Sequence, residues 1–166
     1  MIFAQPSWER LTIHRQFNAT AESVFTALTD PKKVMKWWGP KGFTCPMCRI
    51  DLRVGGEYLV CMRSPKGEDY WSKGVYLEIR NNERIVVSDS FSDEHGNIRT
   101  ASSVGLPGSW PSTLTISVDL HFQDGETSLI LIHEGLPLQL VESCRAGWNE
   151  MLDRLPLALS KTQDML

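Results

Sequence analysis

The chain has 166 residues, the size of one ordinary domain, and we expect residues 1–166 to form a single domain that buries roughly 70% of its unfolded surface. Its formal net charge of -3 at pH 7, without a run of Lys or Arg, disfavours a nucleic-acid partner, which needs a concentrated positive surface. No apolar run approaches the ~20 residues that cross a bilayer and no signal peptide is evident, so we expect a cytoplasmic protein with no membrane partner.

The N-terminal part of the chain predicts one strand and two short helices. Residues 8–17 alternate loosely between apolar and polar side chains, as a strand does. Thr20 is suited to cap a helix over residues 21–28, because a Thr hydroxyl accepts a hydrogen bond from a free amide of the first turn. Asp30 is suited to cap a second helix whose first residue is Pro31, the favoured position for proline.

Turn residues divide the middle of the chain into four predicted strands. Gly-Gly, Pro-Lys-Gly and Asn-Asn sequences mark the turns between them. The strands are expected at residues 43–53, 58–63, 70–80 and 85–91.

The segment 92–112 is rich in Ser, Gly, Pro and Asn and has no periodicity. A long irregular connection of this kind is typical of a functional loop, so one interpretation is a lid in which Leu106 and Trp110 close over a bound molecule. The alternative is a solvated loop that only joins two strands.

The C-terminal part predicts a hairpin and a long helix. Residues 114–122 alternate strictly, a Gln-Asp-Gly-Glu turn follows, and the alternation continues to His133. The helix is expected from Pro137 to about Leu159, shortened or kinked near its end by Pro156. Its apolar stripe comprises Val141, Cys144, Trp148, Met151, Leu152, Leu155 and Leu159.

Hairpin-connected strands followed by one long helix indicate an α+β fold in which the helix covers one face of an antiparallel sheet. The strand phases predict which side chains face that helix. The predicted set is Met47, Tyr58, Val60, Met62, Val75, Leu77, Val87, Phe91, Ile116, Val118, Leu129 and Leu131.

Cys45 and Cys48 form a C-x-x-C sequence, which is also found in zinc sites and redox pairs. Residues three apart in a strand point to opposite faces, unless Pro46 breaks the strand, and no further cysteines have paired spacing. We therefore expect reduced cysteines that act as small apolar side chains, with no metal and no cofactor.

No motif for a catalytic nucleophile, a metalloprotease or a phosphate-binding loop is present, and we assign no catalytic residue. If the protein were an enzyme, the best acid–base candidates would be His133, Tyr58 and Asp89. Aromatic and sulfur-containing side chains are the more informative group, because they suit a site that holds an apolar molecule. The candidate ligand-binding residues are Trp37, Trp38, Met47, Tyr58, Met62, Trp71, Val75, Phe91, Trp110, Leu131, His133, Cys144 and Trp148.

Five short motifs in a fixed order resemble one protein family. They begin with Phe17-Asn-Ala-Thr-Ala-Glu-Ser-Val-Phe25, Trp37-Trp-Gly-Pro40 and Asp51-Leu-Arg-Val-Gly-Gly-Glu-Tyr58, and they end with Gly147-Trp-Asn-Glu-Met-Leu-Asp-Arg-Leu155. This order resembles the AHSA-like proteins, named after the activator of the Hsp90 ATPase, within the START-like (SRPBCC) superfamily. The resemblance implies a helix-grip fold: a curved antiparallel sheet wrapped around a long C-terminal helix, with two short helices near the N-terminus.

The same resemblance implies three kinds of function. The first is binding of a small hydrophobic or aromatic molecule in a cavity between the sheet and the C-terminal helix. The second is activation of a chaperone ATPase in a stress response, although the eukaryotic cochaperone carries an additional domain for which this chain has no room. The third is a cyclase or hydrolase that uses the same cavity. The missing catalytic motifs favour the first.

Overall fold

The computed structural model describes residues 8–160, in which seven strands form one sheet in the order β1-β7-β6-β5-β4-β3-β2. All neighbouring strands are antiparallel. The elements follow the chain as β1 (Trp8–Phe17), α1 (Ala21–Thr29), α2 (Pro31–Trp37), β2 (Thr44–Ile50), β3 (Glu57–Arg63), β4 (Asp69–Arg80), β5 (Arg84–Ser92), η1 (Ser102–Val104), β6 (Leu114–Gln123), β7 (Glu126–Pro137), η2 (Leu138–Leu140), α3 (Val141–Arg154) and η3 (Leu155–Ala158).

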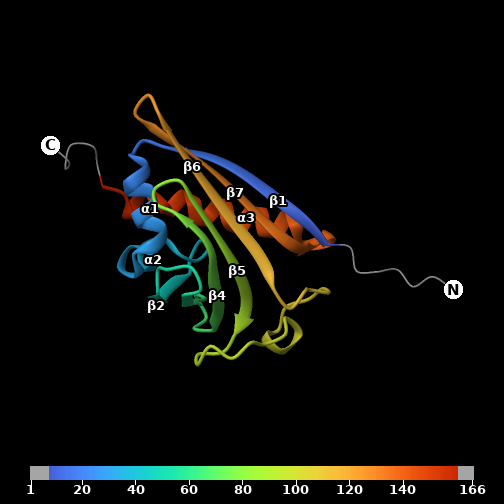
Figure 1. The fold of residues 1–166 in the computed structure, drawn as a ribbon. Coiled ribbons are helices and arrows are strands. Elements are labelled where there is room, and N and C mark those ends of the chain that lie inside the picture. Colours follow the sequence, from blue (N-terminus) through green and yellow to red (C-terminus); the bar gives the residue numbers. More distant parts are fainter. Residues whose placement is uncertain (1–7, 161–166) are drawn as a thin grey trace.

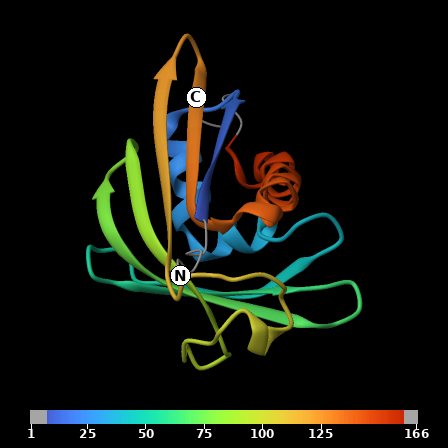
Figure 2. The same ribbon diagram turned by 90° about the vertical axis from the view of Figure 1, so that its right-hand side faces the viewer.

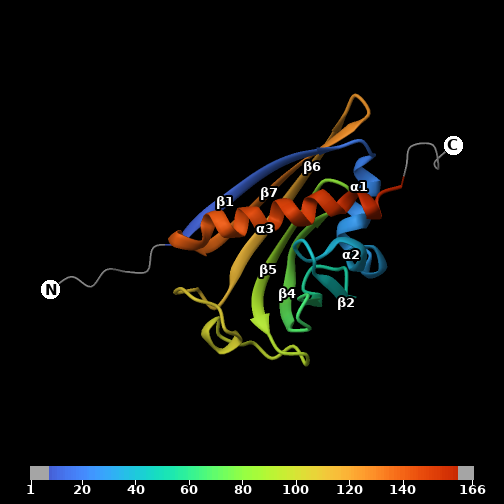
Figure 3. The same ribbon diagram turned by 180° about the vertical axis from the view of Figure 1, so that it is seen from behind.

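The sheet curves around α3, which confirms the predicted helix-grip fold (Figure 1). Figure 2 looks along α3 and shows β1, β7 and β6 on one side of the helix while β4 and β3 pass below it. Seen from behind, α3 crosses the concave face of the sheet, and α1 and α2 lie at one end (Figure 3). β-Bulges interrupt the pairing of β1 with β7, β2 with β3 and β4 with β5, and bulges of this kind bend strands.

Both N-terminal helices are capped as the sequence predicts. The Thr20 hydroxyl accepts a hydrogen bond from the Ser23 amide at 3.1 Å, and the Asp30 carboxylate accepts one from the Lys32 amide at 2.9 Å. The Trp37 indole N–H donates to the Ala27 carbonyl at 2.8 Å. This last bond fixes α2 against α1, so the Trp37 ring is buried at the end of the concave face.

The C-terminal helix begins later than Pro137. Pro137 and Leu136 still belong to β7, where they pair with Trp8 and Glu9 of β1, and a 3₁₀ turn then leads into α3 at Val141. The α-helix ends at Arg154, just before Pro156, as the missing proline N–H predicts. No helix among residues 8–160 is long and apolar enough to span a bilayer.

The phase of β4 differs from the prediction. Tyr76 is only 4% exposed and faces α3, whereas Leu77 is 52% exposed on the other face. The inward positions expected for Val75 and Leu77 are therefore wrong. Val75 and Leu77 are apolar but lie on the face opposite to Tyr76, so a phase read from the apolar residues selects the wrong face.

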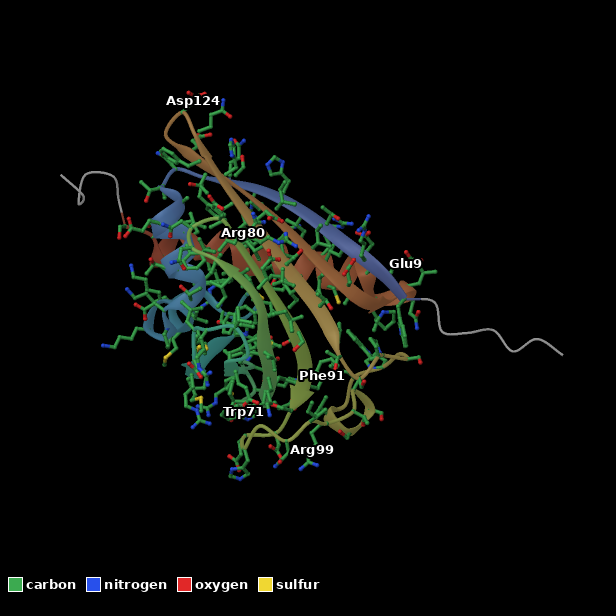
Figure 4. The ribbon with its side chains drawn as sticks, viewed as in Figure 1. Glu9, Trp71, Arg80, Phe91, Arg99 and Asp124 are labelled. Carbon is green, nitrogen blue, oxygen red and sulfur yellow. The ribbon has the colours of Figure 1, made fainter. Side chains whose placement is uncertain are left out.

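The irregular connection after β5 is held by its own hydrogen bonds. The Asp93 carboxylate accepts bonds from the Asn97 side-chain amide, from the backbone amides of Asn97 and His95, and from the Arg99 guanidinium, and these donors lower the Asp93 pKa to about 2. Figure 4 shows Arg99 in this connection, next to the end of the sheet where Trp71 and Phe91 lie. The connection is thus built around a structured turn, and its opening as a lid stays a prediction.

Candidate functional site

A cavity lies between the concave face of the sheet and α3. The centre of a water-sized molecule can reach about 100 Å³ of this space, several times what one water molecule needs. The lining side chains are apolar or aromatic almost throughout. They are Leu28, Val34, Trp37, Trp38, Cys48, Ile50, Tyr58, Val60, Tyr76, Ile85, Val87, Ile116, Val118, Leu131, Trp148 and Leu152.

Three tryptophans form one wall of the cavity. Trp38 meets Trp37 and Trp148 edge-to-face, with ring centroids 5.4 Å and 5.6 Å apart. The Trp148 indole N–H donates to His133 Nδ1 at 3.0 Å, which ties α3 to β7. These contacts join the two short helices, α3 and the sheet into one rigid aromatic wall.

The structure brings some of the predicted ligand-binding residues to the cavity and places others beside it. Those that line it are Trp37, Trp38, Tyr58, Leu131 and Trp148. His133 lies behind Trp148, to which it is hydrogen-bonded, and Cys144 is half-buried against the main core.

The remaining predicted site residues do not line the cavity. Met47 pairs with Cys61, and Cys61 pairs with Trp71, so these three side chains share the face of the sheet opposite to Val60 and the cavity. Val75 lies on that opposite face as well, for the reason given above. The others extend beyond the cavity at the end of the sheet: Met62 is paired with Tyr70, and Phe91 packs edge-on against Trp110.

Several lining residues were not among the predicted site residues. Cys48 and Ile50 reach the cavity because the bulge at Pro46 changes the phase of β2. Leu28 and Val34 come from the two short helices, whose packing on the sheet no strand pattern reveals. One sequence signal could have placed Tyr76 in the cavity. Gly74, two residues earlier on the same face of β4, is typical of a position where another group approaches the backbone closely.

Tyr58, Gly74 and Asp89 form a row across three neighbouring strands. The Tyr58 ring lies over Gly74, where a Cβ would be only 2.1 Å from the ring carbon Cε1. Because no side chain intervenes, the Tyr58 hydroxyl reaches β5 and donates a short hydrogen bond to the Asp89 carboxylate. Burial raises the Asp89 pKa to about 6, although the bond from Tyr58 opposes this shift.

Replacing Gly74 by Ala is expected to displace the Tyr58 ring, because the added methyl group also approaches the Ser88 carbonyl oxygen to 2.2 Å. Overpacking of this kind costs about 1–3 kcal/mol of unfolding free energy. Gly147→Ala is a matched control, since a Cβ at this α3 position meets nothing within 4 Å and should add about 0.5–1 kcal/mol. Urea denaturation measures the unfolding free energy, which should fall in Gly74→Ala and rise in Gly147→Ala. Equal changes in the two variants would contradict the steric role of Gly74.

The two cysteines of the C-x-x-C sequence lie on one side of β2, not on opposite faces. Cys45 and Cys48 both pack against Val34 and Val60, because the bulge at Pro46 changes the phase of the strand. Burial raises the Cys45 pKa to about 11 and the Cys48 pKa to about 12, so both thiols stay protonated at neutral pH. Within the described part of the chain, no three His, Cys, Asp or Glu side chains gather as metal ligands do.

The three acid–base candidates belong to two separate pairs. Tyr58 is bound to Asp89, whereas His133 accepts its hydrogen bond from Trp148. Burial lowers the His133 pKa to about 4, and its Nε2 atom is enclosed without a partner among residues 8–160. His133 is not among the residues that line the cavity.

Comparison with known proteins agrees with this architecture. The family model described as "Activator of Hsp90 ATPase homolog 1-like protein" matches residues 18–160, which include every residue that lines the cavity. No curated protein matches the chain significantly.

Solved structures of similar proteins share the fold. A protein from Chromobacterium violaceum is 28% identical, with a TM-score of 0.73 over 90% of this chain and 96% of its own. The AHSA1 protein from Silicibacter pomeroyi is 21% identical, with a TM-score of 0.70 over 89% of this chain and 94% of its own. CalU16 from Micromonospora echinospora is 20% identical, with a TM-score of 0.63 over 96% of this chain and 89% of its own.

Proposed function

The chain belongs to the family of Activator of Hsp90 ATPase homolog 1-like proteins, and from this premise we propose that it binds a small hydrophobic or aromatic molecule between its sheet and α3. The observation that carries the proposal is a cavity with about 100 Å³ open to the centre of a water-sized molecule, whose lining is apolar and aromatic. A well-packed core leaves few voids larger than a water molecule, so an apolar space that exceeds one water several-fold can admit a small apolar molecule.

Rigid walls support the binding role. Trp38 and Trp148 are held edge-to-face, and the Trp148 N–H is already bound to His133. Because these rings are ordered before a ligand arrives, binding immobilises few side chains. As part of the proposal we place the protein in the cytoplasm as one domain, since its four cysteines are free thiols and the seven strands of residues 8–160 form one sheet.

Filling the cavity should abolish binding while the fold stays intact. In Val87→Phe the larger ring enters the cavity from β5, whereas Val86→Phe places the same ring on the opposite face of the same strand. N-Phenyl-1-naphthylamine, an uncharged probe that fluoresces in apolar sites, should bind the wild type and the Val86 variant but not the Val87 variant. Circular dichroism checks that both variants are folded.

Equal binding of the probe to all three proteins would contradict the proposal, because the probe would then bind elsewhere. A chaperone partner, which the family name suggests, would instead dock on the outer surface. If the protein acts on a chaperone in this way, both Val86→Phe and Val87→Phe should leave the activated ATPase rate at its wild-type value. An ATPase assay of the two variants therefore distinguishes the two roles. Native mass spectrometry of the freshly purified protein tests directly for a bound molecule.

A further inference from the structure

The Tyr76 hydroxyl is a polar group without a partner at an apolar cavity. Tyr76 is only 4% exposed, and its ring lines the cavity. The Tyr76 hydroxyl makes no hydrogen bond within residues 8–160. In this part of the chain, His133 Nε2 is the one polar side-chain atom that is both fully enclosed and without a partner. The Tyr76 hydroxyl is therefore not fully enclosed, and the cavity is the space that the Tyr76 side chain lines.

A buried hydroxyl without a hydrogen bond is unfavourable, so this site needs a complementary group. Burial raises the pKa of Tyr76 well above its usual range, and the phenol keeps its proton at neutral pH. A phenolic O–H is a good donor and a weaker acceptor, since its lone pairs are partly delocalised into the ring. Tyr76 is therefore equipped to donate one hydrogen bond to a guest.

The surroundings of Tyr76 define the charge of that guest. The lining contains no Lys, Arg, His, Asp or Glu side chain. The nearest charged group that the contacts reach is the Asp89 carboxyl, which is bound to Tyr58 and offers no positive charge to an anion. A ligand carboxylate or phosphate would thus lose its hydration without gaining a cationic partner.

Tyr58 fixes the direction of the Tyr76 ring. The two rings meet edge-to-face with centroids 6.0 Å apart, and Tyr58 is itself held by Asp89 and by the space above Gly74. Contacts that run from Asp89 on β5 through Tyr58 on β3 therefore fix the orientation of the Tyr76 ring on β4.

We propose that the ligand of this cavity is an uncharged ring compound with a carbonyl oxygen, and that this oxygen accepts a hydrogen bond from the Tyr76 hydroxyl. The inference rests on the proposed binding function and adds the chemical class of the ligand. Trp38 is the competing donor, because its indole N–H also has no acceptor in the described residues while its ring lines the cavity.

The test uses 1-tetralone and tetralin, two probes with the same fused rings, of which only tetralone has a carbonyl oxygen. NMR titration gives the dissociation constant of each probe for the wild type and for Tyr76→Phe. The substitution should weaken tetralone binding about two- to tenfold, the effect of one net hydrogen bond, and leave tetralin binding unchanged. The ¹³C resonance of the bound carbonyl should lie further downfield in the wild type than in the variant.

Two controls keep the outcomes separate. Tyr70→Phe removes a hydroxyl that binds Glu68 on the surface and should change neither affinity. If Trp38→Phe rather than Tyr76→Phe removes the preference for tetralone, the assignment to Tyr76 is wrong. If both probes bind and Tyr76→Phe changes them equally, the carbonyl class is wrong although the cavity binds ligands. If neither probe binds the wild type, the proposed function itself fails.

Discussion

Replacing Trp148 by Ala is expected to lower the free energy of unfolding by about 3–5 kcal/mol, as deletions of large buried aromatic side chains do. Trp148 is 9% exposed, contacts the rings of Trp38 and His133 edge-to-face, and donates the hydrogen bond that joins α3 to β7. The expected loss is a large part of the ~5–15 kcal/mol that stabilises a typical domain.

Guanidinium denaturation at constant pH measures this loss. Trp8→Ala is the matched control, because Trp8 is 46% exposed at the start of β1 and its removal should cost far less than that of Trp148. Trp148→Phe keeps a ring in the core but removes the donor to His133, so it should lie between the wild type and Trp148→Ala. A melting temperature that Trp148→Ala leaves unchanged would falsify the role of Trp148 in the core.

Asp89→Asn is expected to change how stability depends on pH between about 4 and 6.5. The Asp89 pKa rises from 3.8 to about 6 on folding, so the folded state binds more protons and stability falls as pH rises across this window. The His133 pKa falls from 6.5 to about 4, so stability falls as pH drops across the same window. Each group changes the free energy of unfolding by about 3 kcal/mol across this pH window, and the two opposite changes nearly cancel in the wild type.

The variants separate the two contributions. Asp89→Asn leaves His133 alone, so acidification from pH 6.5 to 4 should lower its stability relative to the wild type by about 3 kcal/mol. His133→Gln leaves Asp89 alone and should show the opposite slope. Urea denaturation at several pH values measures the differences between variant and wild type, in which the contributions of all other groups cancel. Parallel curves for wild type and Asp89→Asn would show that the Asp89 carboxyl is not perturbed by burial.

Much of the fold could be predicted from local patterns. Thr20 and Asp30 cap their helices as expected, and the strict alternation from Leu114 identifies β6 because period-two patterns and capping residues act over a few residues. The family resemblance supplied the curvature of the sheet, which no local pattern contains. The long C-terminal helix begins within a few residues of Pro137 as expected, and the pairing of Pro137 with Trp8 decides that the helical turns start only after this proline.

The site could be predicted only in part. Trp38, Tyr58 and Trp148 line the cavity as expected of large aromatic residues near the grip. Met47, Trp71 and Val75 do not: an irregularity precedes Met47 in β2, whereas Trp71 and Val75 are apolar residues on the face of β4 opposite to Tyr76. A one-residue change of phase moves a side chain through the sheet, so an error at one bulge affects every later position in the strand.

The sequence by itself determined the antiparallel sheet, the capped helices and the apolar stripe of α3, since each depends on residues close together along the chain. Only the tertiary structure decided that space remains between α3 and the sheet, that Tyr58 crosses Gly74 to reach Asp89, and that Tyr76 lines the cavity. Empty volume and unpartnered atoms depend on how three or more elements pack together. A one-dimensional pattern of polar and apolar residues does not contain that information.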